Sequence, residues 1–170
     1  KLLIDCGLFQ GSKECDALNH EQFHFDPHAI DALIVTHAHL DHVGRIPKLV
    51  CEGFSGKIYS TAATRELAEL ILDDALHLSE RTGDALYDER DLQKTFEQWH
   101  IRSYDASWEI GGIAIRLNDA GHILGSALVE LWAEGRHLLF TGDLGNTPSS
   151  LLPQPKLFRD IEYLIIESTY

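Results

Sequence analysis

The sequence predicts an α/β fold in which two groups of β-strands are separated by helices. Short apolar runs lie near the start of the chain, hydrophobic residues recur with a helical period in its middle, and alternation of period two dominates its second half. Strands followed by helices and then by further strands are typical of mixed, layered α/β domains. With 170 residues, 44% of them hydrophobic, the chain is long enough to form one domain with a buried core.

The first third of the chain is expected to contain three short strands. A polar loop follows the first strand up to about Pro27. A short helix is expected from about Asp41, with Pro47 near its first turn, where proline is tolerated. The three strands are apolar runs bounded by polar residues or glycine, and they extend over Leu2 to Asp5, Ala32 to Val35 and Lys57 to Ser60.

Two helices are expected in the middle of the chain. The first runs from Thr61 to about Glu80, and the second runs from Asp88 to His100, where the Asp88 carboxylate is a suitable N-cap. The hydrophobic residues that recur at helical spacing in the first helix are Leu67, Leu70, Ile71, Ala75 and Leu78.

The second half is expected to consist mainly of strands. Alternation in the segment 113–117 indicates one strand, and Glu134-Gly135-Arg136 indicates a hairpin turn between two others. A proline-containing loop from Gly145 to Lys156 precedes the last apolar run. The further strands are expected at Ala127 to Ala133, His137 to Thr141 and, as a buried strand, Tyr163 to Ile166.

The bulk composition excludes some classes of protein. A net charge of −13 argues against a broadly basic nucleic-acid-binding surface within these residues. The 3 cysteines form no CxxC pair, so we expect no disulfide framework and a cytoplasmic location. The sequence has neither a membrane-spanning apolar run nor a signal-peptide pattern. Because it lacks methionine and begins and ends in apolar runs, we interpret it as an internal piece of a larger protein.

Three histidines and one aspartate follow the second strand within the segment THAHLDH. His37 and His39 are two residues apart, so in an extended turn both imidazoles can point to one side and bind one metal ion. Asp41 and His42 lie where the chain turns into a helix and can face the same cavity from another direction. A carboxylate beside an imidazole suits a second divalent ion, and zinc accepts both ligand types. The alternative is a solvated loop whose histidines share no function.

A further histidine follows a strand in the segment AGHILGS. His122 can complete a three-histidine set with the two histidines of HAH, whereas on its own it would equally suit a turn. Gly121 and Gly125 would allow a close approach of the backbone, and the Ser126 hydroxyl could hydrogen-bond to nearby groups.

Two aspartates at strand ends are candidates for the same site. Asp143, in TGDLG, can present a carboxylate that bridges two cations; the alternative is an aspartate that stabilises a turn. Asp5 ends the first strand, and we expect it to fix the histidine loop through hydrogen bonds.

The series HxHxDH, GHILGS and TGD resembles the motif series of the metallo-β-lactamase fold, an αββα sandwich of two sheets with helices outside. The segments IDCGLFQG, THAHLDHVGRIPKL, DAGHILGSA, TGDLGN and LIIESTY are similar to its β-CASP branch of RNA-processing nucleases, and to bacterial and archaeal RNases in particular. The resemblance spans nearly all of residues 1–170. It implies a partial domain that lacks the first strands and an inserted β-CASP domain, which would begin after Tyr170.

The resemblance also implies a role for each candidate residue. His37, His39 and His122 would bind one Zn²⁺, Asp41 and His42 would bind a second Zn²⁺, and Asp143 would bridge the two ions. Asp41 would also take a proton from the attacking water. Glu167, in LIIESTY, would orient one of two further histidines that lie outside this chain; the alternative is a charged residue at a strand end.

The implied activity is hydrolysis of RNA phosphodiester bonds by a hydroxide formed between two metal ions about 3.5–4 Å apart. The products would carry a 5′-phosphate and a 3′-hydroxyl, and this piece alone is not expected to be a competent enzyme. RNA is the expected partner, and the inserted domain is expected to supply most of its binding surface. We expect no binding to membranes, and the sequence does not decide whether the protein forms a homodimer. The alternatives are a small-molecule hydrolase of thioesterase or lactonase type, and a scaffold subunit without metals.

Overall fold

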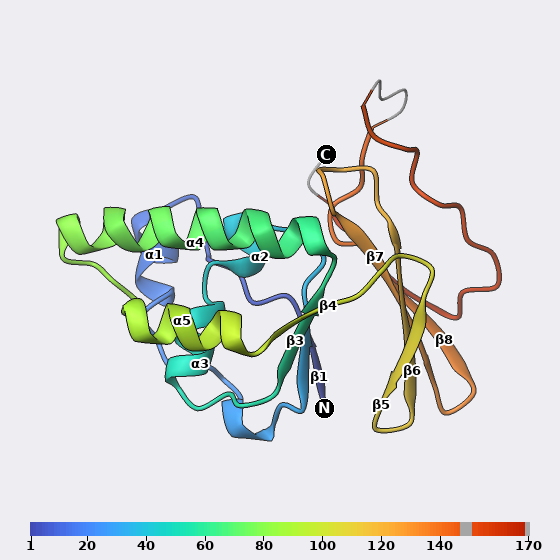
Figure 1. The fold of residues 1–170 in the computed structure, drawn as a ribbon, viewed down its shortest axis with the longest axis horizontal. Helices are drawn as coiled ribbons and strands as arrows, with labels where there is room; N and C mark the ends of the chain where they lie inside the picture. The colour runs from blue at the N-terminus through green and yellow to red at the C-terminus, as the bar shows by residue number, and fades with distance from the viewer. Residues whose placement is uncertain (147–150, 169–170) are drawn as a thin grey trace.

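The computed structural model describes residues 1–146 and 151–168. Two β-sheets lie face to face, and the α-helices cover the outer side of the first sheet (Figure 1). Ile34 of the first sheet meets Ile115 and Val129 of the second in the apolar layer between them. The predicted α/β sandwich is confirmed. Within the described ranges the helical layer lies on one side, and the outer side of the second sheet is partly covered by Phe158 and Ile161.

The first sheet is parallel throughout, with strand order β1-β2-β3-β4. Parallel strands need crossover connections, and helices on one face of the sheet supply them here. The strand β2 is buried along its whole length because it lies inside the sheet and is covered on both faces. The four strands are β1 Leu2–Ile4, β2 Ala32–Ile34, β3 Lys57–Ser60 and β4 Trp99–Ile101.

The second sheet has the order β5-β6-β7-β8-β9 and is antiparallel except for the last pair. Its inner face is apolar, whereas the outer face of β6 and β7 carries Arg116, Asn118 and Glu130. The strands are β5 Ser107–Ile110, β6 Ile113–Asp119, β7 Ala127–Ala133, β8 Arg136–Phe140 and β9 Tyr163–Ile165.

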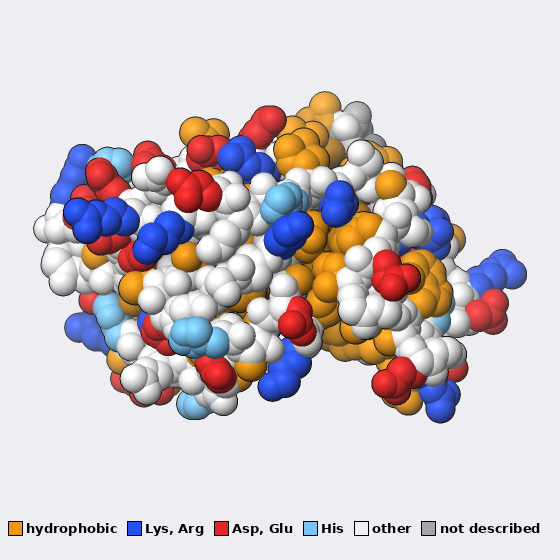
Figure 2. All heavy atoms as spheres, turned by 60° about the horizontal axis from the view of Figure 1, so that its bottom comes forward, with side chains coloured by type: hydrophobic (Ala, Val, Ile, Leu, Met, Phe, Trp, Pro, Cys, Tyr) orange, Lys and Arg blue, Asp and Glu red, His pale blue; other side chains and the backbone are white. Residues whose placement is uncertain are grey.

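The helices pack a second apolar core against the first sheet. Leu72 and Leu76 of α4 are buried with Ile58 of β3 and with Leu49 of α3. Charged side chains are spread over this helical layer, whereas hydrophobic side chains gather towards the second sheet (Figure 2). The helical segments are α1 Lys13–Leu18, the 3-10 turn Pro27–Ala29, α2 Leu40–Val43, α3 Ile46–Cys51, α4 Ala62–Thr82 and α5 Glu89–Glu97.

The structure corrects three expectations about these elements. The polar loop after β1 contains α1, whose first turn is capped by the Ser12 hydroxyl. The second predicted helix ends at Glu97, and Trp99 and His100 belong to β4, where the Trp99 indole donates a hydrogen bond to the buried Ser60 hydroxyl (2.8 Å). The strand β5 was not expected at all. In β4 and β5, pairing with neighbouring strands decides the structure, and local sequence does not report that pairing.

The final strand also differs from its expected environment. Tyr163 to Ile166 are 46–58% exposed, and within the described residues β9 is an edge strand paired with β8. Residues 147–150 of the predicted loop and Thr169 and Tyr170 of the LIIESTY segment lie outside the described residues. Within the described part of the chain, none of the helices is long and apolar enough to cross a membrane. The three cysteines are free, as expected.

Candidate metal centre

The predicted site residues gather at one rim of the sandwich. The strands β1, β2, β6, β8 and β9 all reach this rim with their carboxyl ends, because β6, β8 and β9 run in one direction in the second sheet and β1 and β2 are parallel in the first. Asp5, the histidine loop, the His122 loop, Asp143 and Glu167 each follow one of these ends. The chain topology therefore brings together residues that are up to 162 positions apart.

Three histidines and one aspartate form a compact cluster of four potential ligand atoms, all within 4.8 Å of one another. His39 Nδ1 lies 3.0 Å from His37 Nε2 and 3.2 Å from His122 Nε2. Asp143 Oδ2 lies 3.9 Å from His37 Nε2 and 3.7 Å from His122 Nε2. The cluster joins His37, His39, His122 and Asp143, which are the residues predicted for the first metal ion and the bridge.

A second group of ligand atoms lies on the other side of Asp143. His42 Nε2 lies 3.3 Å from Asp143 Oδ1 and 3.7 Å from Asp41 Oδ2. The two carboxylate oxygens of Asp143 therefore face different groups: Oδ2 faces the three-histidine cluster, and Oδ1 faces His42. This is the arrangement required of a carboxylate that bridges two cations.

Spacing and ligand type in both groups fit zinc. Ligand atoms about 2.0–2.1 Å from a tetrahedral zinc ion lie about 3.3 Å from one another. The six distances given above run from 3.0 Å to 3.9 Å, and the four atoms of the first group all lie within 4.8 Å of one another. Imidazole nitrogens and carboxylate oxygens are also ligands that zinc prefers.

Asp5 holds the histidine loop from below the rim. Its Oδ1 accepts a hydrogen bond from the Thr36 amide (2.7 Å), and its Oδ2 accepts from the Thr36 hydroxyl (2.7 Å). Its Oδ2 also lies 2.7 Å from His42 Nδ1, so a proton on Nδ1 leaves Nε2 free to accept, as a ligand must. Asp5 sits in the left-handed region with φ of 58°, a conformation that aspartate tolerates better than most residues. Thr36, which sequence reasoning missed, stands directly before His37 in THAHLDH.

Two glycines let neighbouring segments approach the site. A Cβ atom on Gly7 would lie 1.6 Å from the Asp41 carbonyl oxygen, so the turn after β1 can pass the histidine loop only without a side chain. Gly125, at φ of 84°, brings the His122 loop against the start of α4. Within that loop the Ser126 hydroxyl accepts hydrogen bonds from the amides of His122 (3.1 Å) and Ile123 (3.2 Å).

Glu167 lies beside the ligand cluster rather than in it. Its Oε1 accepts a hydrogen bond from the Leu144 amide, and its own amide donates to the Thr141 hydroxyl (3.1 Å). With Asp5 and His42 it lines a cavity of about 320 Å³ below the rim. The carboxylate therefore stands next to the loop that carries Asp143.

The electrostatics keep two of the histidines neutral. Burial, reinforced by the neighbouring imidazoles of His42, His39 and His122, lowers the pKa of His37 to about 2. Burial is also the largest influence on His122 and lowers its pKa. For His42, burial is outweighed by the hydrogen bond and charge of Asp5 and by the charges of Asp143 and Asp41, so its pKa is raised. Neutral imidazoles expose the lone pair that a metal ion needs.

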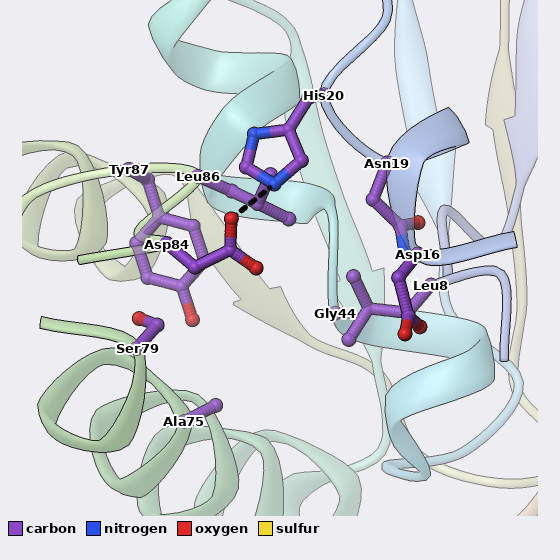
Figure 3. Close-up of a pocket in the computed structure, with 10 residues that line it drawn as sticks. All are labelled: Leu8, Asp16, Asn19, His20, Gly44, Ala75, Ser79, Asp84, Leu86 and Tyr87. Carbon is purple, nitrogen blue, oxygen red and sulfur yellow. Dashed lines mark ion pairs between the residues drawn. The ribbon is translucent and has the colours of Figure 1, made fainter. Parts of the chain in front are cut away.

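The cavity in Figure 3 is separate from this rim. It has a volume of about 180 Å³ and lies beside the helical layer, where His20 points towards Asp84 across from Asp16 (Figure 3). The His20 Nε2 to Asp84 Oδ1 distance is 2.9 Å, but both side chains are largely solvated. An ion pair of this kind contributes little to stability and does not make a site.

Three proteins whose names refer to ribonuclease activity, transcription termination, or cleavage and polyadenylation are similar to this chain in sequence. Ribonuclease TTHA0252 of Thermus thermophilus is 41% identical over 170 residues, which are all of this chain and 38% of that protein. Transcription termination factor FttA of Methanocaldococcus jannaschii is 37% identical over all of this chain and 28% of that protein. Cleavage and polyadenylation specificity factor subunit 3-I of Arabidopsis thaliana is 32% identical over 99% of this chain and 24% of its own length. The chain thus spans about a quarter to two fifths of these relatives, which confirm the resemblance to β-CASP nucleases.

Solved structures agree on the fold. A metallo-beta-lactamase with a HARLDQ motif from Cronobacter sakazakii matches 89% of this chain and 55% of its own, with a TM-score of 0.54 and 19% identity. Zn(2+)-bound PqqB from Methylobacterium extorquens matches 84% of this chain and 48% of its own, with a TM-score of 0.55 and 13% identity. The sequence model of the metallo-beta-lactamase superfamily matches residues 1–163. The chain belongs to the metallo-beta-lactamase superfamily.

Proposed function

We propose that this chain carries the dinuclear zinc centre of a ribonuclease. The carrying observation is the pair of ligand groups that share Asp143: three histidine nitrogens on one side, and Asp41 with His42 on the other. The relatives named as a ribonuclease and as cleavage or termination factors support RNA as the substrate.

Two divalent ions bound there would neutralise the oxygens of a scissile phosphodiester and acidify a water molecule. His37, His39 and His122 would hold one ion, Asp41 and His42 would hold the other, and the Asp143 carboxylate lies between the two groups. The Asp41 carboxylate is half exposed at the rim, so it could accept a proton from a water molecule bound there. Asp5 Oδ2 lies 2.7 Å from His42 Nδ1, and a proton held there would leave Nε2 as the ligand atom.

Glu167 is proposed to act outside the ligand set. Its contact with the Leu144 amide ties the end of β9 to the loop after Asp143. A residue contributed by the rest of the protein, such as a histidine that protonates the leaving oxygen, could be oriented from this position.

The experiment uses the full-length protein, with its metal content measured and its cleavage of single-stranded RNA assayed. We expect about two zinc ions per chain, loss of cleavage on chelation, and its return with added zinc. His39→Ala should abolish cleavage without unfolding the protein. His77→Ala is a matched control, because His77 lies exposed on α4 and, among the described residues, bonds to Asp73 of its own helix. Full RNase activity in His39→Ala would refute the proposal.

Activity of the full-length protein on a thioester or lactone, with none on RNA, would instead favour the small-molecule hydrolase. A correctly folded protein that binds no zinc would favour the scaffold. The relatives support the ribonuclease over both alternatives, and all six proposed ligand positions carry residues able to bind metal.

A further inference from the structure

The His122 loop is held from outside by the first turn of α4. The hydroxyls of Thr61 and Thr64 each lie 2.8 Å from the carbonyl oxygen of Gly125 and donate to it. Both side chains are buried, with exposed fractions of 6% and 0%. In Figure 1, the N-terminal end of α4 points towards the second sheet, to which this loop belongs.

A second contact holds the next carbonyl of the loop. The Tyr104 hydroxyl, on the segment between β4 and β5, donates to the carbonyl oxygen of Ser126 (2.7 Å). The amide of the following residue, Ala127, donates to the Thr36 carbonyl (2.8 Å), directly before His37. Two consecutive carbonyls are therefore bound by three hydroxyls, and the adjoining amide is bound to the histidine loop.

Helix capping accounts for only part of this arrangement. The Thr61 hydroxyl accepts from the Thr64 amide (3.2 Å), as an N-cap residue does. The Thr64 hydroxyl has no capping role, and it donates to a loop 61 residues away in the sequence. A Cβ atom on Gly125 would lie 2.6 Å from the Thr64 amide nitrogen, so the loop lies directly on the helix end.

We propose that Thr61, Thr64 and Tyr104 are positioning residues that hold His122 in place for the first metal ion. This rests on the proposed function, because it assigns His122 to that ion. Between β6 and β7 the loop has only the 7 residues 120–126, and the internal bonds of Ser126 to His122 and Ile123 make its last half rigid. Fixing the carbonyls of Gly125 and Ser126 therefore fixes the direction of the His122 ring relative to His39. A preorganised ligand binds its metal more tightly, because less order has to be imposed on binding.

The test measures the zinc affinity of the full-length protein by competition with a chelator, without RNA. Thr64→Val keeps the shape of the side chain and removes the hydroxyl, whereas Thr64→Ser keeps the hydroxyl and removes a buried methyl group. We expect Thr64→Val to weaken zinc binding about three- to tenfold and Thr64→Ser to bind within about twofold of the wild type. Equal zinc affinity in the wild type and Thr64→Val, or equal losses in the Val and Ser variants, would overturn the proposal.

Tyr104→Phe is the second variant, and it also serves if Thr64→Val does not fold. It should weaken zinc binding to a similar extent, and unchanged affinity would count against the proposal. The control is Asp88→Ala, which removes the N-cap of α5, a helix that supplies none of the three hydroxyls bonded to the carbonyls of Gly125 and Ser126. Its zinc affinity should equal that of the wild type.

The outcomes also separate this inference from the proposed function. A wild-type protein that binds no zinc would refute the dinuclear centre itself. A wild type that binds zinc through His122, as shown by loss of affinity in His122→Ala, together with an unaffected Thr64→Val, would refute only the positioning role.

Discussion

Two clusters of polar side chains, the rim and the outer face of the second sheet, have similar residues and different chemistry. The rim holds histidines beside Asp143, and the outer face holds His137 beside Glu130, which is 2% exposed. Glu130 and His137 lie on strands of the five-stranded sheet, and Asp143 follows the end of one of its strands. The composition of the two clusters alone would not separate them.

Their hydrogen bonding does separate them. Glu130 accepts from Arg116 Nε (2.7 Å), Asn118 Nδ2 (2.6 Å) and His137 Nε2 (3.1 Å). The Trp132 ring stacks on His137 and faces the Arg116 guanidinium, with centroid distances of 4.7 Å and 4.8 Å. In this cluster, the chain itself supplies a cation and two further donors to a buried anion, as a structural network requires.

At the rim the facing atoms are mainly acceptors. Three imidazole nitrogens and a carboxylate oxygen converge within 4.8 Å, and within the described part of the chain the ion pairs of Asp143 are with histidines. Since the pKa of His37 is held near 2 and that of His122 is also lowered, protonation of these rings does not supply the positive charge. The four converging atoms suit an external cation, with the titratable His42 beside them, whereas the Glu130 carboxylate, which accepts from an arginine, an asparagine and a histidine, belongs to the scaffold.

The largest expected effect comes from removing the bridge. Asp143→Ala should lower RNA cleavage by at least about 1,000-fold, because it removes several kcal/mol of metal-centred stabilisation of the transition state. It should also lower the zinc content. In the metal-free protein the same change should cost less stability than removal of Glu130, since among the described residues Asp143 faces the titratable His42 imidazole (3.3 Å) and forms no ion pair with an arginine or lysine. Chemical denaturation with and without chelator checks both statements, and a metal-free Asp143→Ala protein destabilised as much as Glu130→Ala would contradict the comparison.

The opposite result is expected at the outer face. Glu130→Ala should lower the free energy of unfolding by about 3 kcal/mol, because it leaves Arg116 and Asn118 without their buried acceptor. Zinc affinity should not change. Denaturation curves and chelator competition on the same preparation measure the two quantities, and a loss of zinc affinity with intact stability would show that the network belongs to the metal centre.

The sequence alone could locate the rim because metal ligands combine rare residue types with short spacing and strand ends. THAHLDH placed four candidates in one loop, and the apolar strands before His122 and Asp143 indicated that their ends could meet. The same reasoning could not show which nitrogen of each histidine faces the cluster: His37, His42 and His122 use Nε2, whereas His39 uses Nδ1. That choice depends on ring orientation, which is set by side-chain contacts both near in sequence, as between His37 and Thr36, and distant, as between His42 and Asp5.

The helix α4 was predicted from its length and apolar spacing, but its buried face differs from the predicted one. Ala68, Leu72 and Leu76 are buried, whereas Leu70 and Leu78 of the predicted stripe are 69% and 61% exposed. The fold was not predicted where a distant partner decides. Trp99 continues a helical pattern in sequence, but its indole bonds to Ser60 and its backbone pairs with β3. The carbonyl contacts of Thr64 and Tyr104 were missed for the same reason, because a hydroxyl in the sequence does not indicate which backbone oxygen it reaches.

Asp5 has an intermediate place in the comparison, because it lies at the rim and yet has its own donors in Thr36 and His42. Asp5→Asn keeps an acceptor for Thr36 but no longer favours a proton on His42 Nδ1. Zinc affinity should fall by about 10- to 100-fold, as for other residues that orient a metal-binding histidine. Zinc titration of the full-length protein checks this expectation. An unchanged affinity would place Asp5 with the structural network of Glu130 instead.

The smallest expected effect concerns acid stability and distinguishes the two clusters by pH. Burial raises the pKa of Glu130, but it is outweighed by the hydrogen bonds and charge of Arg116, Asn118 and His137, so the pKa is lowered from its ordinary value of 4.5. A carboxylate with a lowered folded-state pKa contributes stability above its unfolded-state pKa, and this contribution is lost as pH falls through the folded-state value. Measured in chelator, so that metal loss does not interfere, wild type should therefore lose more stability below pH 4.5 than Glu130→Gln, which has no charge to lose. Parallel stability curves for the two proteins through this range would show that Arg116 and His137 do not stabilise the ionised form of Glu130. The Glu130 network could then no longer serve as the structural counterpart of the cation site at the rim.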